Sequence, residues 1–248
     1  MPVLPSCLVD PLWDQFAALL PEHVNTHPLG CHNPRIPDRT VFEHVLAALV
    51  HGSGYERIAT IGCSDRTIRR RLAHWAELGL AKQVHALALA AYDRMIGLDL
   101  GELSVDGCIT KSPCGGEKSG RSPVDRGKQG LKRSAASEAR GVPLGLVSAG
   151  ANRHDSPLLV PTLEAVQTQV GELPDDVNVN LDRGYDSAKS RIALAEFGFT
   201  GEIARKGVPA PIQAGKRWVI ERTQCATRRS VCIPGSAGRN SEGGSWAG

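Results

Sequence analysis

The sequence predicts an α/β protein in which an all-helical N-terminal part is followed by a mixed β-sheet with flanking helices. Apolar residues recur at helical spacing up to about Leu98, whereas from Leu100 onward short alternating segments, typical of strands, take turns with helical ones. A last region, residues 224–248, contains five glycines and four serines without apolar periodicity, and we expect it to be disordered. The expected division is therefore 1–98, 99–223 and 224–248.

The overall composition argues against several classes of protein. Of the 248 residues, 41% are hydrophobic and 22% are charged, which is near the average for folded soluble chains. No stretch approaches the roughly 20 apolar residues that cross a bilayer, and the first ten residues lack the features of a signal peptide. Seven cysteines without a CxxC pair favour reduced thiols over a disulfide framework or a zinc ribbon. We therefore expect a cytoplasmic protein without a membrane partner.

Three helices are expected in the N-terminal part in addition to a helical pair described below. Residues 12–20 carry leucines and Phe at helical spacing. After two prolines, Thr40 with Glu43 forms a capping-box pattern ahead of an apolar helical face that ends before Gly52. The third helix covers about residues 81–95, which are rich in alanine and leucine. Together these segments predict a helical bundle.

Residues 55–77 show the pattern of a helix-turn-helix motif. A short helix over residues 55–61 precedes Gly62 at the turn, and Ser64 or Asp65 can cap a second helix with an apolar face. The other face of that second helix is basic and carries Arg66, Arg69, Arg70 and Arg71. These like charges repel, and a bound DNA backbone would relieve the repulsion. An ordinary helical hairpin with a solvated arginine face is the alternative.

The second part is expected to alternate strands and helices. A strand over residues 100–109 is followed, after a loop, by two arms around the turn at residues 140–141, the second covering 142–147. Further along the chain the pattern predicts a helix, a strand, a helix and a short strand, over residues 156–170, 177–181, 187–197 and 199–203. Hairpin strands followed by strand–helix alternation indicate a mixed sheet.

The loop over residues 111–133 is strongly basic and rich in glycine. Its two acidic residues stand against seven basic ones, a local net charge of +5 compared with +3 for the whole chain. The basic residues are Lys111, Lys118, Arg121, Arg126, Lys128, Lys132 and Arg133. A flexible basic loop beside a sheet is typical of a track for a phosphate backbone, although a solvated charged loop is the simpler alternative.

Asp106 and Asp182 each follow an apolar strand segment. Two carboxylates on neighbouring strand ends repel, and a divalent cation resolves the repulsion. Mg²⁺ prefers a few carboxylates together with water and substrate phosphates, and two such ions about 4 Å apart can activate an attacking oxygen and stabilise a leaving one. The alternative is that both aspartates cap strands or turns. We assign Asp186 to helix capping, together with Ser187.

Glu221 lies among basic residues, in the segment 216–223. On a helix it shares a face with Trp218, three positions earlier. A glutamate in this setting is commonly the partner of an ion pair, so the residues alone leave a catalytic role open. Zinc is not expected, because Cys31 with His32, and Cys108 with Cys114, lack ligand spacing.

Taken together, these segments resemble the DDE transposases of bacterial insertion sequences, most closely the insertion sequence five group. The resemblance covers about residues 8–223 and rests on six ordered segments: LSVDG at 103–107, the loop pieces 111–117 and 122–128, AGANRHDS at 149–156, DRGYD at 182–186, and RWVIERT at 217–223. It implies a ribonuclease-H-like fold. It also implies a catalytic triad of Asp106, Asp182 and Glu221 that holds two Mg²⁺ ions, for which Mn²⁺ can substitute.

The implied activity is metal-dependent cleavage and strand transfer of double-stranded DNA. Water would free a 3′-hydroxyl at the transposon end, and that hydroxyl would attack target DNA. The resemblance further implies that the helical part binds the terminal inverted repeats, that Arg217 contacts DNA, and that the protein acts as a homodimer on the bacterial nucleoid. A ribonuclease-H-like nuclease of another pathway is a weaker interpretation, because it has less need for a helix-turn-helix motif.

The sequence departs from this family at two places. A tyrosine position of the family is occupied by Ala214, and the resemblance stops near Thr223, where a longer helix is expected. We interpret this as a shifted reading frame and expect the helix around Glu221 to fray, because its last turn would lack packing. The resulting alternative is a catalytically impaired remnant that binds DNA and competes with the intact transposase.

Overall fold

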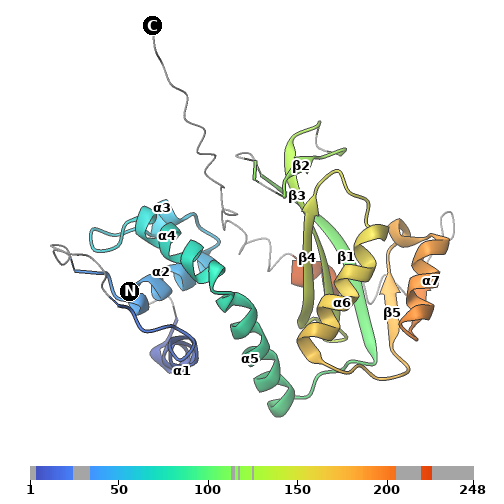
Figure 1. Ribbon diagram of the computed structural model, residues 1–248, viewed down its shortest axis with the longest axis horizontal. Helices are drawn as coiled ribbons and strands as arrows, with labels where there is room; N and C mark the ends of the chain where they lie inside the picture. Colours follow the sequence, from blue (N-terminus) through green and yellow to red (C-terminus); the bar gives the residue numbers. More distant parts are fainter. Residues whose placement is uncertain are drawn as a thin grey trace, which may run out of the picture.

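A computed structural model describes residues 4–24, 34–112, 115–116, 118–124, 126–204 and 219–224. The chain forms a helical part and a sheet part, which lie on either side of one long helix, α5 (Leu80–Met95) (Figure 1). No helix in these ranges is both long enough and apolar enough to cross a membrane. The predicted tail, residues 224–248, lies outside the described residues except for Gln224, and Arg217 also lies outside them.

The helical part contains α1 (Ser6–Ala17), α2 (Asp38–His51), α3 (Tyr55–Ile58), α4 (Asp65–Glu77) and the first half of α5. Its core is aromatic: the ring of Phe16 lies 4.8 Å from that of Trp75 and 5.1 Å from that of Phe42. Val41, Tyr55 and Ile68 complete this core from α2, α3 and α4. Burial of such large rings supplies most of the stability of a small helical bundle.

Two of the predicted helix starts can be compared with the structure. The prediction for α4 is confirmed, because the Ser64 hydroxyl caps the helix by accepting a hydrogen bond from the amide of Thr67 at 3.3 Å. The capping box at Thr40 is wrong, because α2 begins two residues earlier, directly after Pro37. Proline presets the entry to a helix and needs no side-chain cap of its own. The acidic residue in the first turn of α2 is Asp38.

The sheet contains β1 (Glu102–Lys111), β2 (Gly120–Arg121), β3 (Gln129–Glu138), β4 (Pro143–Gly150), β5 (Asn178–Leu181) and β6 (Thr200–Ile203). Its main order is β4-β3-β1-β5-β6, and the short β2 pairs with the start of β3. Strand β3 is antiparallel to β1 and β4, whereas β1, β5 and β6 are mutually parallel. This mixed sheet confirms the predicted class and has the strand order of the ribonuclease-H-like fold.

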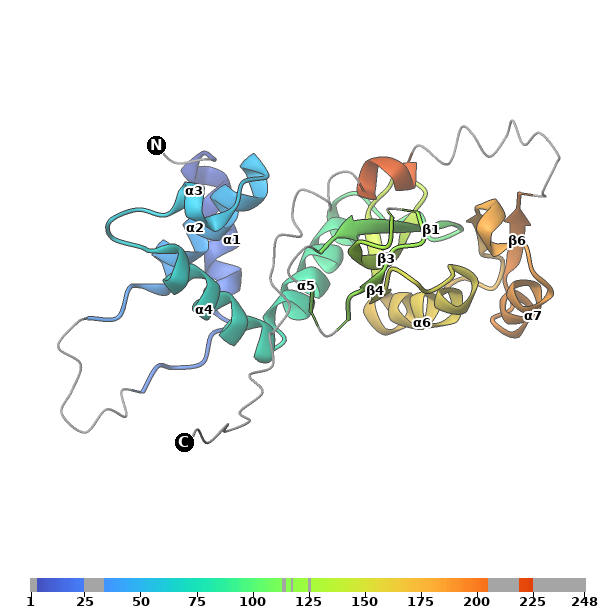
Figure 2. The ribbon, with the colours of Figure 1, turned by 90° about the horizontal axis from the view of Figure 1, so that it is seen from above.

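Helices cover both faces of the sheet. On one face lie η1 (Ser156–Leu158) and α6 (Leu159–Val170), which pack on the apolar residues of β1, β4 and β5, and α7 (Ala188–Glu196) follows η2 (Arg183–Tyr185). Residues 219–224 are helical and lie on the face opposite to α6 (Figure 2). The predicted disordered tail includes Gln224, but the structure has this residue helical and buried.

Candidate functional site

The parallel pair β1 and β5 brings Asp106 and Asp182 together. The ladder between these strands ends with the pair Val105–Leu181, so the two aspartates are the next residues on neighbouring chains. Adjacent strands lie about 4.8 Å apart. The prediction that Asp106 lies at the end of a strand is wrong, because β1 continues to Lys111 beside β3. Asp106 stands instead where the shorter strand β5 ends, which opens space for its side chain.

Both aspartates line one small pocket, on the sheet face that carries residues 219–224. The other lining residues are Ser104, Val105, Asn180, Leu181 and Ile220. The Asp106 carboxylate accepts a hydrogen bond from the amide of Gly107 at 2.7 Å, and that of Asp182 accepts one from the amide of Arg183. Each carboxylate is thus held by the amide of the next residue, and Asp182 is the N-cap of η2, so the capping role considered from the sequence coexists with a position in the pocket.

The two carboxylates at the pocket suit a hard cation. Carboxylates together with the amide of Asn180 and the hydroxyl of Ser104 are the donor types that Mg²⁺ and Mn²⁺ bind, and a partly open pocket leaves room for water and phosphate oxygens. Within the described ranges, no three His, Cys, Asp or Glu side chains converge closely enough to hold a metal ion. The structure therefore gathers the two aspartates but does not bring Glu221 into a three-residue cluster with them.

Glu221 lies on the short helix at residues 219–224 and is exposed. The residue before it, Ile220, is buried and lines the pocket. This helix is anchored to the turn between β3 and β4: the Thr223 hydroxyl donates to the carbonyl of Gly141 and the Arg222 guanidinium to that of Arg140, both at 2.6 Å. The prediction that the helix around Glu221 frays for lack of packing is wrong for residues 219–224, because Ile220 and Thr223 are both buried.

The four arginines of α4 differ in their surroundings. Arg66 and Arg70 are exposed. Arg69 pairs with Glu56 at 3.1 Å and Asp65 at 3.4 Å.

Arg71 is only 8% exposed and pairs with Asp38, so its predicted place on the outer face is wrong. It lies on the inner side because α4 places it over the start of α2, where the carbonyl of Ile36 also accepts from it. Burial lowers the pKa of Arg71, and the charge of Arg35 acts in the same direction.

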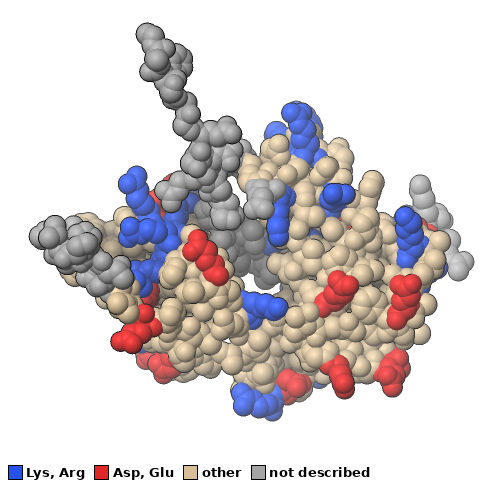
Figure 3. Space-filling view, in the orientation of Figure 1, with Lys and Arg blue, Asp and Glu red and all other residues tan. Residues whose placement is uncertain are grey.

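The basic loop is shorter than predicted. Strand β3 begins at Gln129, so Lys132 and Arg133 are strand residues, and both are buried. Lys132 pairs with Asp155, and Arg133 donates to the thiol of Cys108 at 3.4 Å. The remaining basic side chains of the loop are exposed: Lys111, Lys118, Arg121, Arg126 and Lys128. Lys and Arg side chains gather over α4 and over the region of β2 (Figure 3).

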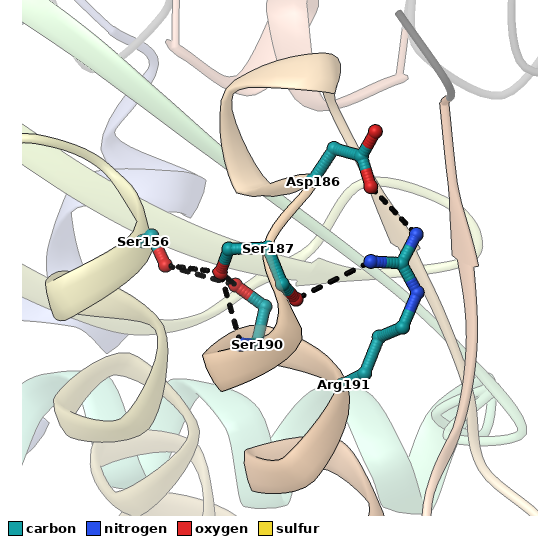
Figure 4. A network of polar contacts seen from close by, with 5 residues as sticks. All are labelled: Ser156, Asp186, Ser187, Ser190 and Arg191. Atoms are coloured by element: carbon teal, nitrogen blue, oxygen red, sulfur yellow. Dashed lines mark hydrogen bonds and ion pairs between the residues drawn. The ribbon is translucent and has the colours of Figure 1, made fainter.

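Three further features lie near the two aspartates, and the sequence did not connect them with the site; of their residues it assigned only Ser187, to helix capping, and Lys132, to DNA binding. Tyr185 is buried, and burial, followed by the charges of Asp155, Asp106 and Asp182, raises the pKa of its hydroxyl. Asp155 forms an ion pair with Lys132. Ser156, Ser187 and Ser190 form a triangle of hydroxyls (Figure 4). The only signal in the sequence is that Asp155 and Ser156 close the segment AGANRHDS, which carries part of the resemblance.

Comparison with known proteins gives two matching family models in succession. The first, described as "Putative transposase of IS4/5 family", matches residues 8–85, and the second, described as "Transposase DDE domain", matches residues 104–225. A relative in Burkholderia cepacia, named "Putative transposase for insertion sequence element IS402", is 37% identical over 114 residues. That alignment covers 44% of this chain and 54% of the relative, so the chain matches about half of the relative's length.

Two solved structures also match the chain, both at low structural similarity. The crystal structure of the Mos1 mariner paired end complex with Mn matches 92% of this chain and 83% of its own, at 11% identity and a TM-score of 0.32. The simian T-cell lymphotropic virus intasome, in complex with a regulatory subunit of PP2A, matches 62% of this chain and 56% of its own, also at 11% identity and a TM-score of 0.32.

Proposed function

The chain belongs to the DDE transposases of insertion sequences, and we propose that it binds the terminal inverted repeats of its element and cleaves and transfers DNA strands there. The observation that carries the proposal is the register of β1 and β5, which sets Asp106 beside Asp182 at the edge of one pocket. Two carboxylates side by side where a parallel strand ladder ends are a suitable site for phosphoryl transfer that depends on a divalent metal.

The catalytic role falls to the sheet part, residues 99–223. Asp106 and Asp182 would hold divalent cations, with Glu221 as the third carboxylate, and Mg²⁺ is the proposed physiological ion. Bound there, the metal would polarise the phosphate and lower the pKa of an attacking water. The chain's own contribution is to orient the two aspartates, whose oxygens are fixed by the amides of Gly107 and Arg183.

The reaction requires no covalent link between protein and DNA. The oxygen of water attacks the phosphorus at the element end, the bond from phosphorus to the 3′-oxygen breaks, and a free 3′-hydroxyl remains on the element. In the second step this hydroxyl attacks a phosphorus of target DNA, and the displaced 3′-oxygen leaves in turn. Buried Tyr185 stays neutral at physiological pH, so it adds no negative charge behind the aspartates.

DNA recognition falls to the helical part, residues 1–98. Because α4 follows a capped turn after α3 and exposes Arg66 and Arg70, it is the proposed recognition helix of a helix-turn-helix motif. Four other basic residues are buried or held in ion pairs: Arg69, Arg71, Lys132 and Arg133. In the sheet part we therefore assign the contacts with the DNA backbone to five exposed residues, which are Lys111, Lys118, Arg121, Arg126 and Lys128. Arg217 stays a proposed contact, and a homodimer would hold two element ends.

The proposal is tested with a labelled duplex that carries an end of the encoding element and its flank, incubated with the full chain and Mn²⁺. We expect nicking at the end that disappears in Asp106→Asn, Asp182→Asn and Glu221→Gln. Glu196→Gln, the same change at an exposed position of α7, is the matched control and should nick like the unchanged protein. Nicking that survives Asp106→Asn would rule out the proposed site.

A second candidate function is DNA binding without cleavage, in competition with an intact transposase. The observation in its favour is the exposed position of Glu221, outside a three-residue cluster with the two aspartates. Gel shifts from the same reactions distinguish the two functions. A specific shift without nicking by the unchanged protein supports the competitor, whereas nicking that depends on Glu221 excludes it.

A further inference from the structure

A buried ion pair lies behind the two aspartates, on the other face of the sheet. The ammonium of Lys132 lies 2.9 Å from a carboxylate oxygen of Asp155, and the two side chains are 9% and 29% exposed. Lys132 is opposite Ile109 in the β1–β3 register, so it shares a face with Gly107. Successive side chains of a strand alternate between faces, so Asp106 points the other way. Asp155 therefore approaches the site from behind.

The carboxylate of Asp155 is in contact with the backbone that follows each aspartate. A Cβ atom added to Gly107, the residue after Asp106, would meet one oxygen of Asp155 at 2.0 Å. One added to Gly184, two residues after Asp182, would meet the other oxygen at 3.6 Å. One oxygen of Asp155 thus occupies the space beside Gly107 and the other lies near Gly184, in the two separate segments that carry the pocket's acids, and Lys132 holds that side chain in place.

The residue next to Asp155 fixes one of these two segments, the one that follows Asp182, from the side. The Ser156 hydroxyl lies 3.0 Å from that of Ser187 and 2.9 Å from that of Ser190, at the start of α7 (Figure 4). Ser187 also caps α7 by accepting from the amide of Ser190. The chain from Asp182 to α7 is therefore tied to the segment around Asp155 at both of its ends.

We propose that Asp155, held by Lys132, is a positioning residue that sets the separation of Asp106 and Asp182 and thereby the affinity of the site for divalent metal. The inference rests on the proposed function, since it presumes that these aspartates bind metal. It assigns Lys132, a residue of the predicted DNA track, to the support of the site instead. Partners that orient metal ligands commonly change metal affinity or activity by about 10–100-fold when they are lost.

The first test replaces the pair by neutral side chains of similar shape, in the full chain. Removing one partner alone leaves a buried charge and endangers folding, whereas removing both is often tolerated. We expect Lys132→Met/Asp155→Asn to keep the thermal unfolding temperature of the unchanged protein. Its affinity for Mn²⁺, measured from the electron paramagnetic resonance signal of the free ion, should fall by about 10–100-fold. A purely structural pair would leave Mn²⁺ affinity unchanged, and that result overturns the proposal.

A second test moves Asp155 without changing any charge. Gly107→Ala pushes the Asp155 carboxylate away, whereas Gly101→Ala, the same change just before β1, meets only one atom at 3.9 Å and is the matched control. We expect Mn²⁺ affinity to fall in Gly107→Ala and to stay unchanged in Gly101→Ala. Because the loss acts through Asp155, Gly107→Ala should add nothing further in a Lys132→Met/Asp155→Ala background, which leaves no unpaired charge. If the effects of Gly107→Ala and of the Asp155 change on Mn²⁺ affinity are fully additive, the proposal is contradicted. This second test remains decisive even if Lys132→Met/Asp155→Asn fails to fold.

The outcomes separate this inference from the proposed function. Mn²⁺ binding that is lost in Asp106→Asn is taken as binding at the pocket. If that Mn²⁺ binds and depends on Asp155 but no DNA is nicked, the proposed cleavage fails and the positioning role stands. If nicking occurs and the Mn²⁺ affinity is insensitive to both tests, the positioning role fails alone. Absence of any Mn²⁺ binding that depends on Asp106 overturns both.

Discussion

At the scale of single residues, Tyr185 combines deep burial with three acidic neighbours. Its hydroxyl lies under the sheet edge, where burial and the charges of Asp155, Asp106 and Asp182 all disfavour the phenolate. A raised pKa means that the folded state keeps its proton where the unfolded chain has lost it. The stabilisation from this residue is therefore complete below the ordinary tyrosine pKa of about 10 and decreases as the pH rises above it.

This predicts an alkaline instability that one oxygen atom controls. Between pH 10 and 11 the free energy of unfolding of the unchanged protein should fall by about 1 kcal/mol more than that of Tyr185→Phe. Urea unfolding followed by far-UV circular dichroism at each pH measures the difference, and pH 7 is the internal reference. Parallel curves for the two proteins across this range would contradict the account of Tyr185.

Buried charges are what the sequence could least predict at this scale. The arginine run of α4 indicated a basic face, but nothing in the local pattern separated Arg71 from Arg70, because only the approach of α2 with Asp38 decides which side chain is enclosed. Lys132 was assigned to a loop for the same reason: its partner Asp155 is 23 residues away. The aspartates were recoverable because each directly follows an apolar strand segment.

At the scale of elements, the short helix at residues 219–224 depends on a few contacts with the turn between β3 and β4. Gly141 at this turn has a φ of +92°, and a Cβ there would come within 2.9 Å of Val219 and Arg222. Only glycine allows the helix to approach so closely. The Thr223 hydroxyl donates to the carbonyl of Gly141 at 2.6 Å and also lies 3.1 Å from that of Val219. The helix is thereby held against this turn, with Ile220 in the pocket.

Thr223→Val, which keeps the shape of the side chain, should release this helix. The lost hydrogen bonds leave the Gly141 carbonyl without its hydroxyl donor, and we expect the free energy of unfolding to fall by about 1 kcal/mol. Nicking should fall with it, because Glu221 loses its fixed place. Thr168→Val on α6, where an exposed hydroxyl bonds only to the carbonyl of Glu164, is the matched control. Nicking that is equal in the two variants would separate Glu221 from the anchor.

The elements that the sequence predicted well are those with local signals. Ser64 capped α4 as expected, and the strand and helix order from β3 to β6 followed from periodicity. The two-residue strand β2 was missed, because Gly120 and Arg121 have no strand pattern of their own and pair only because β3 lies beside them. The helix α3 ends at Ile58, shorter than predicted, because Thr60 and Cys63 form a bridge across the turn.

At the scale of the whole molecule, α5 belongs to two cores. Leu80 at its start is buried in the aromatic core of the helical part, whereas Leu89 is buried in the core of the sheet part. His85 lies between them, and its side chain is 2.8 Å from the carbonyl of Pro143. One continuous helix of 16 residues therefore fixes the orientation of the two parts.

Breaking α5 between the two cores should separate recognition from cleavage. Ala86→Pro removes a helical hydrogen bond at an exposed position and kinks the helix, at a cost of about 3 kcal/mol in the helix itself. We expect the gel shift with element-end DNA to persist while nicking at the end falls at least about tenfold, a factor that corresponds to roughly 1.4 kcal/mol. Ala86→Ser is the control. Unchanged nicking in Ala86→Pro would show that the two parts work independently.

A helix shared by two cores also limits which insertions and deletions the chain can accept. Each residue added between Leu80 and Leu89 would turn one core by about 100° and move it by about 1.5 Å relative to the other. Only changes close to whole turns would bring the two surfaces back into phase. Lengthening the exposed loop between β1 and β3 costs far less, since loop closure depends only weakly on length. We therefore expect the length of α5 to be fixed during divergence, while that loop varies freely.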